Sequence, residues 1–218
     1  MNEEGTPTNE AGAQDPMPEL RRLLSGRSVM YAADGTLADP WVEACLARWA
    51  EDGAVCPPVR FQAGGDALLV LFEAASGDSN EAYAILRTTL AGLVMEGVIR
   101  SARWCGEGGV LVAAVDGLGR TTGDASGESP AGVVLHWTPS AEPALILERE
   151  LFGEGLGRVL VTVRGEDAGR VVKQAKILGA EASRIGTVSG SGLVIRFGER
   201  EWCASVEDLL GGPSLGSA

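Results

Sequence analysis

The sequence predicts an α+β protein, and two observations carry this prediction. Short apolar runs of strand length alternate along the chain with segments in which apolar residues recur at helical spacing. Glycine accounts for 31 of the 218 residues, about twice its usual share of ~7%, which is typical of short elements joined by tight turns. With 45% hydrophobic and 22% charged residues, the composition is that of a globular chain with one core domain.

The first 56 residues are expected to lie outside that core domain. Residues 1–18 are acidic and lack basic and aromatic side chains, so they bury too little apolar surface to offset the entropy of ordering. We expect a disordered acidic tail there. Residues 19–56 predict a short helical extension with one helix at 18–24 and another at 39–49, where Asp39 can cap and Pro40 suits the first turn. Trp41 and Trp49 could dock a partner or pack against the sheet.

The middle of the chain predicts a buried strand at residues 66–72 and a long helix at residues 81–99. We expect a glycine-bearing loop at 101–109 and a strand at 110–115, because the latter run is short and apolar. Residues 117–132 are polar, glycine-rich and without periodicity, which predicts an exposed loop.

The last third alternates cleanly between the two kinds of element. Residues 158–163 predict a strand and residues 167–178 a helix that Gly179 ends. Residues 185–188 and 193–197 predict two strands joined by a hairpin turn at 189–192. A strand at 201–204 and a short helix at 206–210 follow, and residues 212–218 are expected to form a flexible end.

Charge and cysteine content exclude several classes of protein. Thirty acidic against eighteen basic residues give a net charge of −12, which repels phosphate backbones and anionic lipids, so we expect neither a nucleic-acid nor a membrane partner. No apolar segment is long enough to cross a bilayer, and the start lacks the features of a secretory signal, which predicts a cytoplasmic protein. The four cysteines form no Cys-x-x-Cys pair and are expected to be reduced thiols.

The first candidate site is a glycine-rich loop that precedes an apolar run. It comprises Gly106, Glu107, Gly108 and Gly109. Glycine lets several backbone N–H groups approach an anion closely, which favours a phosphate-binding loop. A plain glycine turn between two elements is the alternative.

The second candidate site combines Glu154 and Arg158 with the glycines between them. An arginine binds phosphate with two parallel hydrogen bonds, and a glutamate can accept from ribose hydroxyls or hold Mg²⁺. The alternative is a surface ion pair beside a tight turn.

The other motifs are better explained by structural roles than by catalytic or nucleotide-binding ones. His136, the single histidine, lies in an apolar strand-like run, where a partly buried, hydrogen-bonded imidazole is favoured over a catalytic base. The turn at 189–192 is favoured over a nucleophile elbow because no helix follows it. P-loop and dinucleotide patterns are missing, so we expect no self-sufficient nucleotide site.

Three landmarks, taken in order, resemble the carboxy-terminal domain of the aminoimidazole ribonucleotide (AIR) synthase-related superfamily, most closely that of phosphoribosylformylglycinamidine synthase. The first is Gly65-Asp66, followed by the long helix and by residues 97–110, GVIRSARWCGEGGV. The second is LFGEGLGR at residues 151–158, which is similar to the family's Leu-Phe-Ser-Glu-Ser-x-Gly-Arg. The third is IGTV at residues 185–188, before the strand at 193–197. The resemblance covers residues 57–211, which are identified as the AIR synthase C-terminal-like domain.

The resemblance implies an α+β fold in which helices pack a mixed sheet. It also implies a part in purine biosynthesis, where the family's carbon–nitrogen ligase amidates formylglycinamide ribonucleotide at the expense of ATP. In the family, ATP and Mg²⁺ bind to a separate amino-terminal domain, so this chain alone would carry no cofactor. An ATP-binding synthase half, a glutaminase subunit or a second copy of the chain would then be its partners. Both candidate sites would face the ribonucleotide's phosphate.

Several residues depart from the family's pattern. Trp104 replaces an acidic residue, Glu107 stands for an aspartate, and Gly106, Gly153 and Gly155 replace serines. Each change to glycine removes a hydroxyl but preserves the backbone shape. Residues 1–56 are also too few to form an ATP-binding domain, so we assign no catalytic and no metal-ligating residue.

Three functions stay open at this point. The chain could be a stand-alone domain of a split synthase that supplies the substrate side of the active site. It could instead be a degenerate, noncatalytic module that binds phosphoribosyl compounds or nucleotides. The third reading is an interaction protein whose cleft stays empty, since a fold does not fix a function.

Overall fold

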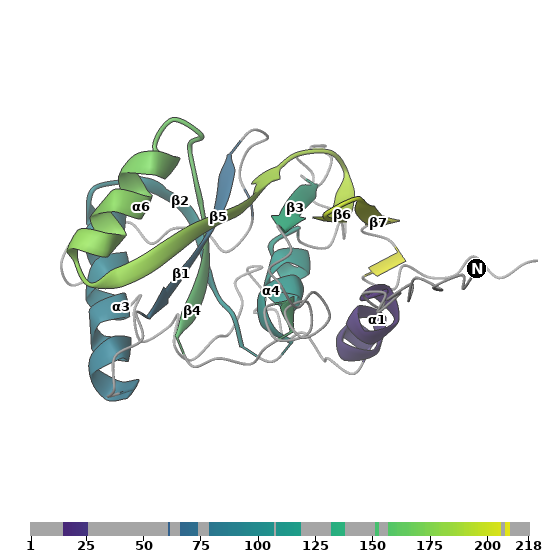
Figure 1. The fold of residues 1–218 in the computed structure, drawn as a ribbon, viewed down its shortest axis with the longest axis horizontal. Coiled ribbons are helices and arrows are strands. Elements are labelled where there is room, and N and C mark those ends of the chain that lie inside the picture. The colour runs from purple at the N-terminus through teal and green to yellow at the C-terminus, as the bar shows by residue number, and fades with distance from the viewer. Residues whose placement is uncertain are drawn as a thin grey trace, which may run out of the picture.

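Seven strands form one sheet with helices on both faces (Figure 1). The computed structural model describes residues 15–25, 61, 66–73, 79–106, 108–118, 132–137, 151–152, 157–205 and 208–209. The helix expected at 39–49 and both chain ends lie outside these residues, so the predicted domain limits stay predictions. The elements are α1 (Met17–Ser25), β1 (Ala67–Glu73), α3 (Ser79–Met95), β2 (Ile99–Trp104), α4 (Gly109–Leu118), β3 (Val133–Trp137), β4 (Arg158–Val163), α6 (Ala168–Ile177), β5 (Ala180–Val188), β6 (Gly192–Phe197) and β7 (Arg200–Ser205).

The sheet is mixed, as the resemblance implied. Its strand order is β2-β4-β1-β5-β3-β6-β7. Every neighbouring pair is antiparallel except β3 and β6, which run parallel. The predicted α+β class with a mixed sheet is therefore confirmed.

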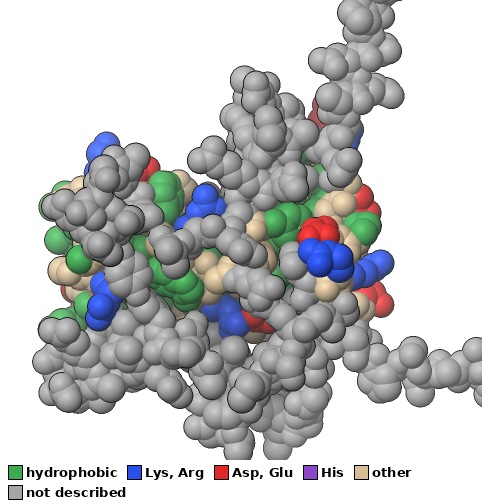
Figure 2. Space-filling view, turned by 90° about the horizontal axis from the view of Figure 1, so that it is seen from below, with side chains coloured by type: hydrophobic (Ala, Val, Ile, Leu, Met, Phe, Trp, Pro, Cys, Tyr) green, Lys and Arg blue, Asp and Glu red, His purple; other side chains and the backbone are tan. Residues whose placement is uncertain are grey.

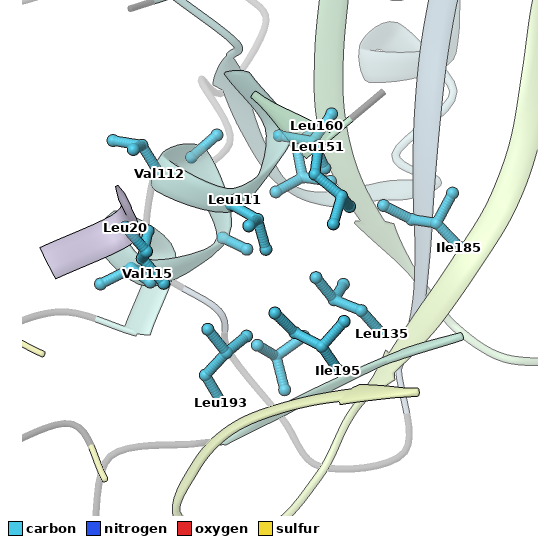
Figure 3. Close-up of a cluster of buried hydrophobic side chains, with 14 of the residues drawn as sticks. Leu20, Leu111, Val112, Val115, Leu135, Leu151, Leu160, Ile185, Leu193 and Ile195 are labelled. Carbon is cyan, nitrogen blue, oxygen red and sulfur yellow. The ribbon is translucent and has the colours of Figure 1, made fainter. Parts of the chain in front are cut away.

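Strand β1 is buried on both faces, which is why it forms an unbroken apolar run. Ala67, Leu69 and Leu71 belong to the core that α3 and α6 cover. Leu68 and Val70 point the other way, into the core that α4 and α1 cover. Figure 3 shows this second core, in which side chains of α1 and α4 meet those of β3 to β6. Helix α1 therefore contributes to the core through the buried Met17 and Leu20.

Helix α3 ends earlier than the predicted limit of residue 99. Gly97 has φ +69°, and its N–H donates to Val94 O at 2.9 Å while Val98 N–H donates to Leu93 O at 3.3 Å. This is the Schellman arrangement, in which a left-handed glycine satisfies the last carbonyls of a helix. The chain then enters β2, so residues 101–104 of the expected loop are strand, Gly109 already belongs to α4, and residues 105–108 connect the two elements.

The strand predicted at 110–115 is wrong, because these residues belong to helix α4. Apart from Asp116 its side chains are apolar, and all ten of its residues are buried. A helix enclosed on every side lacks the polar face that marks an ordinary surface helix. Gly117 and Leu118, expected in an exposed loop, complete α4, while residues 119–131 lie outside the described part.

The hairpin predicted at 189–192 is also wrong. Strands β5 and β6 do not pair, because β3 lies between them. The connection crosses the start of β3, where Gly132 N–H donates to Gly190 O at 2.6 Å and Ser189 N–H donates to Gly132 O at 2.8 Å. A Cβ on Gly132 would lie 2.5 Å from Gly190 C, so this crossing needs glycine.

The surface of the molecule differs from the sequence prediction at one residue. His136 is exposed instead of partly buried, because β3 turns Val133 and Leu135 toward the core and therefore turns the next position, 136, outward. On the face shown in Figure 2, basic and acidic side chains of the described residues are interspersed. None of the helices in the described part is long and apolar enough to cross a membrane.

Candidate functional site

The structure brings the two predicted glycine-rich segments together at one end of the sheet. Strands β2 and β4 pair there, and Cys105 N–H donates to Arg158 O at 2.9 Å. The first residue of α4, Gly109, lies against the backbone of Leu151 and Phe152, since a Cβ on it would stand 2.7 Å from Leu151 O. Segments separated by some forty residues of sequence therefore form one surface.

The loop between β2 and α4 is shaped by glycine. Gly108 has φ +79° and Gly109 has φ +61°, values that other residues rarely adopt. Gly109 N–H donates to Gly106 O at 2.9 Å, and Val112 N–H donates to Gly108 O at 3.4 Å as α4 begins. Gly106 is exposed whereas Gly108 and Gly109 are buried, so the loop reaches solvent at its first glycine.

Positive charge gathers near the start of this loop. Arg158 is half-buried at the first position of β4, on the α4 side of the sheet, because Leu160 two residues later belongs to that core. Burial raises the pKa of the Cys105 thiol to about 12, although the nearby charges of Arg158 and Arg103 oppose the rise. The amino-terminal end of α4 adds the positive end of a helix dipole.

The predicted site residues fall into two groups. Gly106, Gly108, Gly109 and Arg158 are described and lie together at this end of the sheet. Glu107 and Glu154 lie outside the described residues. Their role in binding substrate stays a prediction.

The sequence did not reveal a buried ion pair behind the loop. Arg103 in β2 donates from Nη2 to Asp116 Oδ2 in α4 at 2.5 Å. The one available signal in the sequence is an aspartate that ends an otherwise apolar run, and the predicted strand at 110–115 and loop at 117–132 assign it to neither element.

Metal ligands are sparse in the part of the chain that the structure describes. No three His, Cys, Asp or Glu side chains gather there as a metal site requires. The buried carboxylate behind the loop, Asp116, is held by Arg103.

Comparison with known proteins relates the chain to one enzyme subunit. No protein-family profile matches it. The phosphoribosylformylglycinamidine synthase subunit PurL of Anaeromyxobacter dehalogenans (strain 2CP-C) is 33% identical over 114 residues, which are 51% of this chain and 14% of that protein. PurL of Anaeromyxobacter sp. (strain K) is 32% identical over 114 residues, with the same coverage. The chain thus matches about 14% of the length of these curated relatives.

Solved structures show the same relationship at the level of fold. PurL of T. maritima complexed with ATP superposes with a TM-score of 0.60 and 16% identity, covering 73% of this chain and 28% of that one. The complex of that protein with FGAR gives a TM-score of 0.58 and 17% identity, with 73% and 30% covered. Over about half of its length this chain is therefore similar in sequence to part of PurL, and over 73% of its length it shares the fold of part of that protein.

Proposed function

We propose that this chain supplies the phosphate-binding side of a PurL-like active site in purine biosynthesis, together with a separate ATP-binding part. The observation that carries the proposal is the convergence of the glycine loop with Arg158, joined by the hydrogen bond from Cys105 N–H to Arg158 O. Backbone N–H groups, a helix amino terminus and a guanidinium are the groups that bind phosphate in proteins. The ligand would be a ribonucleotide monophosphate such as formylglycinamide ribonucleotide.

The reaction itself needs groups beyond those described here. The match to curated PurL covers 14% of that subunit, and one solved relative is described as the PurLQS assembly of Thermotoga maritima. We propose that an ATP-binding synthase half or a glutaminase subunit completes the site, and that a second copy of the chain is a further candidate partner. ATP and Mg²⁺ would then be held by the partner.

A second candidate function has its own support. Trp104 and Gly106 stand where the family has an acidic residue and a serine. A phosphate can still be held by backbone N–H groups and arginine, whereas substrate contacts made by the missing carboxylate and hydroxyl are lost. This favours a noncatalytic phosphoribosyl- or nucleotide-binding module as the alternative.

Isothermal titration of the full chain with ribose 5-phosphate and with formylglycinamide ribonucleotide tests the binding proposal. Arg158→Met should weaken binding by roughly ten- to a hundredfold, because a hydrogen bond to a charged group contributes about 1.5–3 kcal/mol. Arg170→Met is the matched control, since Arg170 is exposed on α6, which covers the opposite face of the sheet. Equal affinity of all three proteins would contradict the proposed site.

Purification of the tagged chain from its native cells separates the two candidate functions. Recovery of an ATP-binding synthase half at a fixed ratio supports the split synthase. Recovery of the chain alone, with ribose 5-phosphate binding intact, supports the binding module and rejects the split synthase.

A further inference from the structure

Helices α3 and α6 cover one face of the sheet, and their outer side carries exposed apolar residues. Figure 1 shows the two helices next to each other. In the part of the chain that the structure describes, the strongly exposed large hydrophobic side chains are Met95, Ile177 and Leu178, with 66%, 83% and 42% of their surface in solvent. All three lie at the carboxyl ends of these two helices. Single exposed apolar residues are ordinary on a protein surface, whereas a group of them marks an interaction site.

A hydrogen bond joins the two helix ends into one surface. The side-chain amide of Gln174 in α6 donates to Oε1 of Glu96, the residue directly after α3. Met95 is the neighbour of Glu96 in sequence, and Ile177 lies about one helical turn after Gln174. The same side of α3 is open at Gly92, where an added Cβ would meet no atom within 4 Å.

Positive charge lines the exposed side of α6 beside these residues. Arg170, Lys173 and Lys176 follow one another at three-residue spacing and are exposed, while Val171 and Ala175 between them are buried. The two lysines are the only ones in the chain, which carries a net charge of −12. Neither lysine has a hydrogen-bond or ion-pair partner among the described residues. With the exposed apolar residues they form what we call the α3–α6 surface, which comprises Met95, Lys173, Lys176, Ile177 and Leu178.

Helix stability accounts for only part of this charge. A cation in the last turn of a helix interacts favourably with the helix dipole, which explains Lys176. The effect fades beyond that turn, so it leaves Lys173 unexplained. Lys173 lies about one turn before Ile177 and Lys176 lies directly before it, so two ammonium groups flank the most exposed of the three apolar side chains. Such a surface is complementary to an apolar side chain that carboxylates flank.

The charge of this surface also selects the class of partner. A two-fold contact between copies of the chain brings the same patch against itself, and the lysines of the two copies would then repel each other. Anionic membranes attract clusters of about four to eight basic residues, whereas α6 carries three in a chain of net charge −12. An acidic helix with one apolar side fits both the charge and the exposed apolar residues, because two adjacent helices offer a groove to a third.

We propose that the α3–α6 surface docks an acidic amphipathic helix of another protein. The carboxylates of that helix pair with Lys173 and Lys176, and its apolar side covers Met95, Ile177 and Leu178. The surface lies on the face of the sheet opposite α4 and its glycine loop, so this inference does not depend on phosphate binding at that loop.

Carbodiimide cross-linking tests the proposal, because this reagent couples an amine directly to a carboxylate that contacts it. The tagged full chain is recovered from its native cells at low salt, cross-linked, digested and analysed by mass spectrometry. Every link through a lysine of this chain reports on the α3–α6 surface, since Lys173 and Lys176 are its only lysines. We expect links to Asp or Glu in a partner segment whose apolar residues recur at helical spacing. Links confined to carboxylates of this chain or of a second copy, or no such links, would overturn the proposal.

A synthetic peptide of the linked segment then measures, by fluorescence anisotropy, what each feature of the surface contributes. Lys173→Glu combined with Lys176→Glu should weaken binding by more than about tenfold, because attraction becomes repulsion. Ile177→Ser should weaken binding by about tenfold and leave the melting temperature unchanged, because this side chain is 83% exposed in the free protein.

Arg21→Glu combined with Arg22→Glu is the matched control for the lysine variant. It changes the net charge by the same amount on α1, at the other end of the molecule (Figure 1). Equal affinity of the lysine variant and this control would contradict docking on α6. Co-sedimentation of the chain with phosphatidylserine vesicles that requires both lysines would assign the surface to a membrane, and would likewise overturn the proposal.

Discussion

Replacing Gly109 with alanine should destabilise the fold more than its single added methyl group suggests. At φ +61° an alanine pays a left-handed backbone cost of ~1–2 kcal/mol. Its Cβ would also stand 2.7 Å from Leu151 O and 2.8 Å from Phe152 C, and overpacking of this kind costs ~1–3 kcal/mol. The free energy of unfolding should therefore fall by about 2–5 kcal/mol, and the melting temperature by about 4–20 °C at ~2–4 °C per kcal/mol for a chain of this size.

Urea denaturation followed by far-ultraviolet circular dichroism measures the change. Gly92→Ala is the matched control, because Gly92 lies within α3 and its added Cβ would have no atom within 4 Å. Alanine should stabilise that helix by up to ~1 kcal/mol. The opposite signs separate a local steric effect from a general effect of losing glycine. A Gly109→Ala protein as stable as the wild type would refute both the left-handed turn and the close approach of Leu151.

Three further predictions concern the core and its ionisable groups. Cys105, whose burial raises its pKa to about 12, should resist iodoacetamide at about pH 8, whereas the exposed Cys203 should react. Peptide mapping by mass spectrometry measures the labelling of both thiols. Equal labelling of the two in the native state would contradict the burial of Cys105. Burial raises the pKa of Asp66 despite Arg100 at 3.0 Å, so the folded state holds that proton more tightly than the unfolded state does. The contribution of Asp66 to the unfolding free energy should then fall as pH rises from its ordinary pKa of about 3.9 through the raised value, and Asp66→Asn should remove that fall in denaturation curves recorded from about pH 4 upward. Leu111→Ala, in the fully buried α4, should lower the free energy of unfolding by about 2–5 kcal/mol in urea, and a loss below about 1 kcal/mol would show that this core is loosely packed.

Helix α4 marks the limit of what periodicity can predict. A short apolar run is compatible with a buried strand and with a buried helix, because both hide every side chain. The sequence pattern therefore predicts a strand at residues 110–115, although the structure has one ten-residue helix there that also includes Gly109 and Asp116. By contrast, α3 and α6 keep one polar face, and the sequence predicted both. Burial on all sides removes the signal on which the prediction depends.

The crossing between β5 and β6 could not be predicted for a different reason. The glycine-rich segment at 189–192 has the composition of a hairpin turn. The strand that separates β5 from β6 comes from residues 133–137, far earlier in the chain. Local turn chemistry carries no information about such an insertion, whereas the close approach of Gly132 to Gly190 shows how the backbone accommodates it.

Parts of the candidate site were predictable because backbone shape depends on glycine. Gly108 and Gly109 adopt left-handed conformations, and the resemblance to the family implied that their loop and the segment of Arg158 face the same phosphate. The Arg103–Asp116 pair was not predictable, because thirteen residues separate its members and no helical or strand spacing connects them. Tertiary packing alone brings β2 alongside the end of α4.

The glycines of the loop limit which parts of a substrate the proposed site can recognise. In the proposed site, Gly106 takes the position that the resemblance gives to a family serine, so a bound ligand would meet backbone N–H groups instead of a hydroxyl. Backbone groups and guanidinium recognise the charge and geometry of a phosphate but not the rest of a substrate. A site of this composition should therefore bind ribose 5-phosphate nearly as well as the complete ribonucleotide. A preference of more than about tenfold for formylglycinamide ribonucleotide would show that residues elsewhere in the chain restore the specificity that the loop lacks.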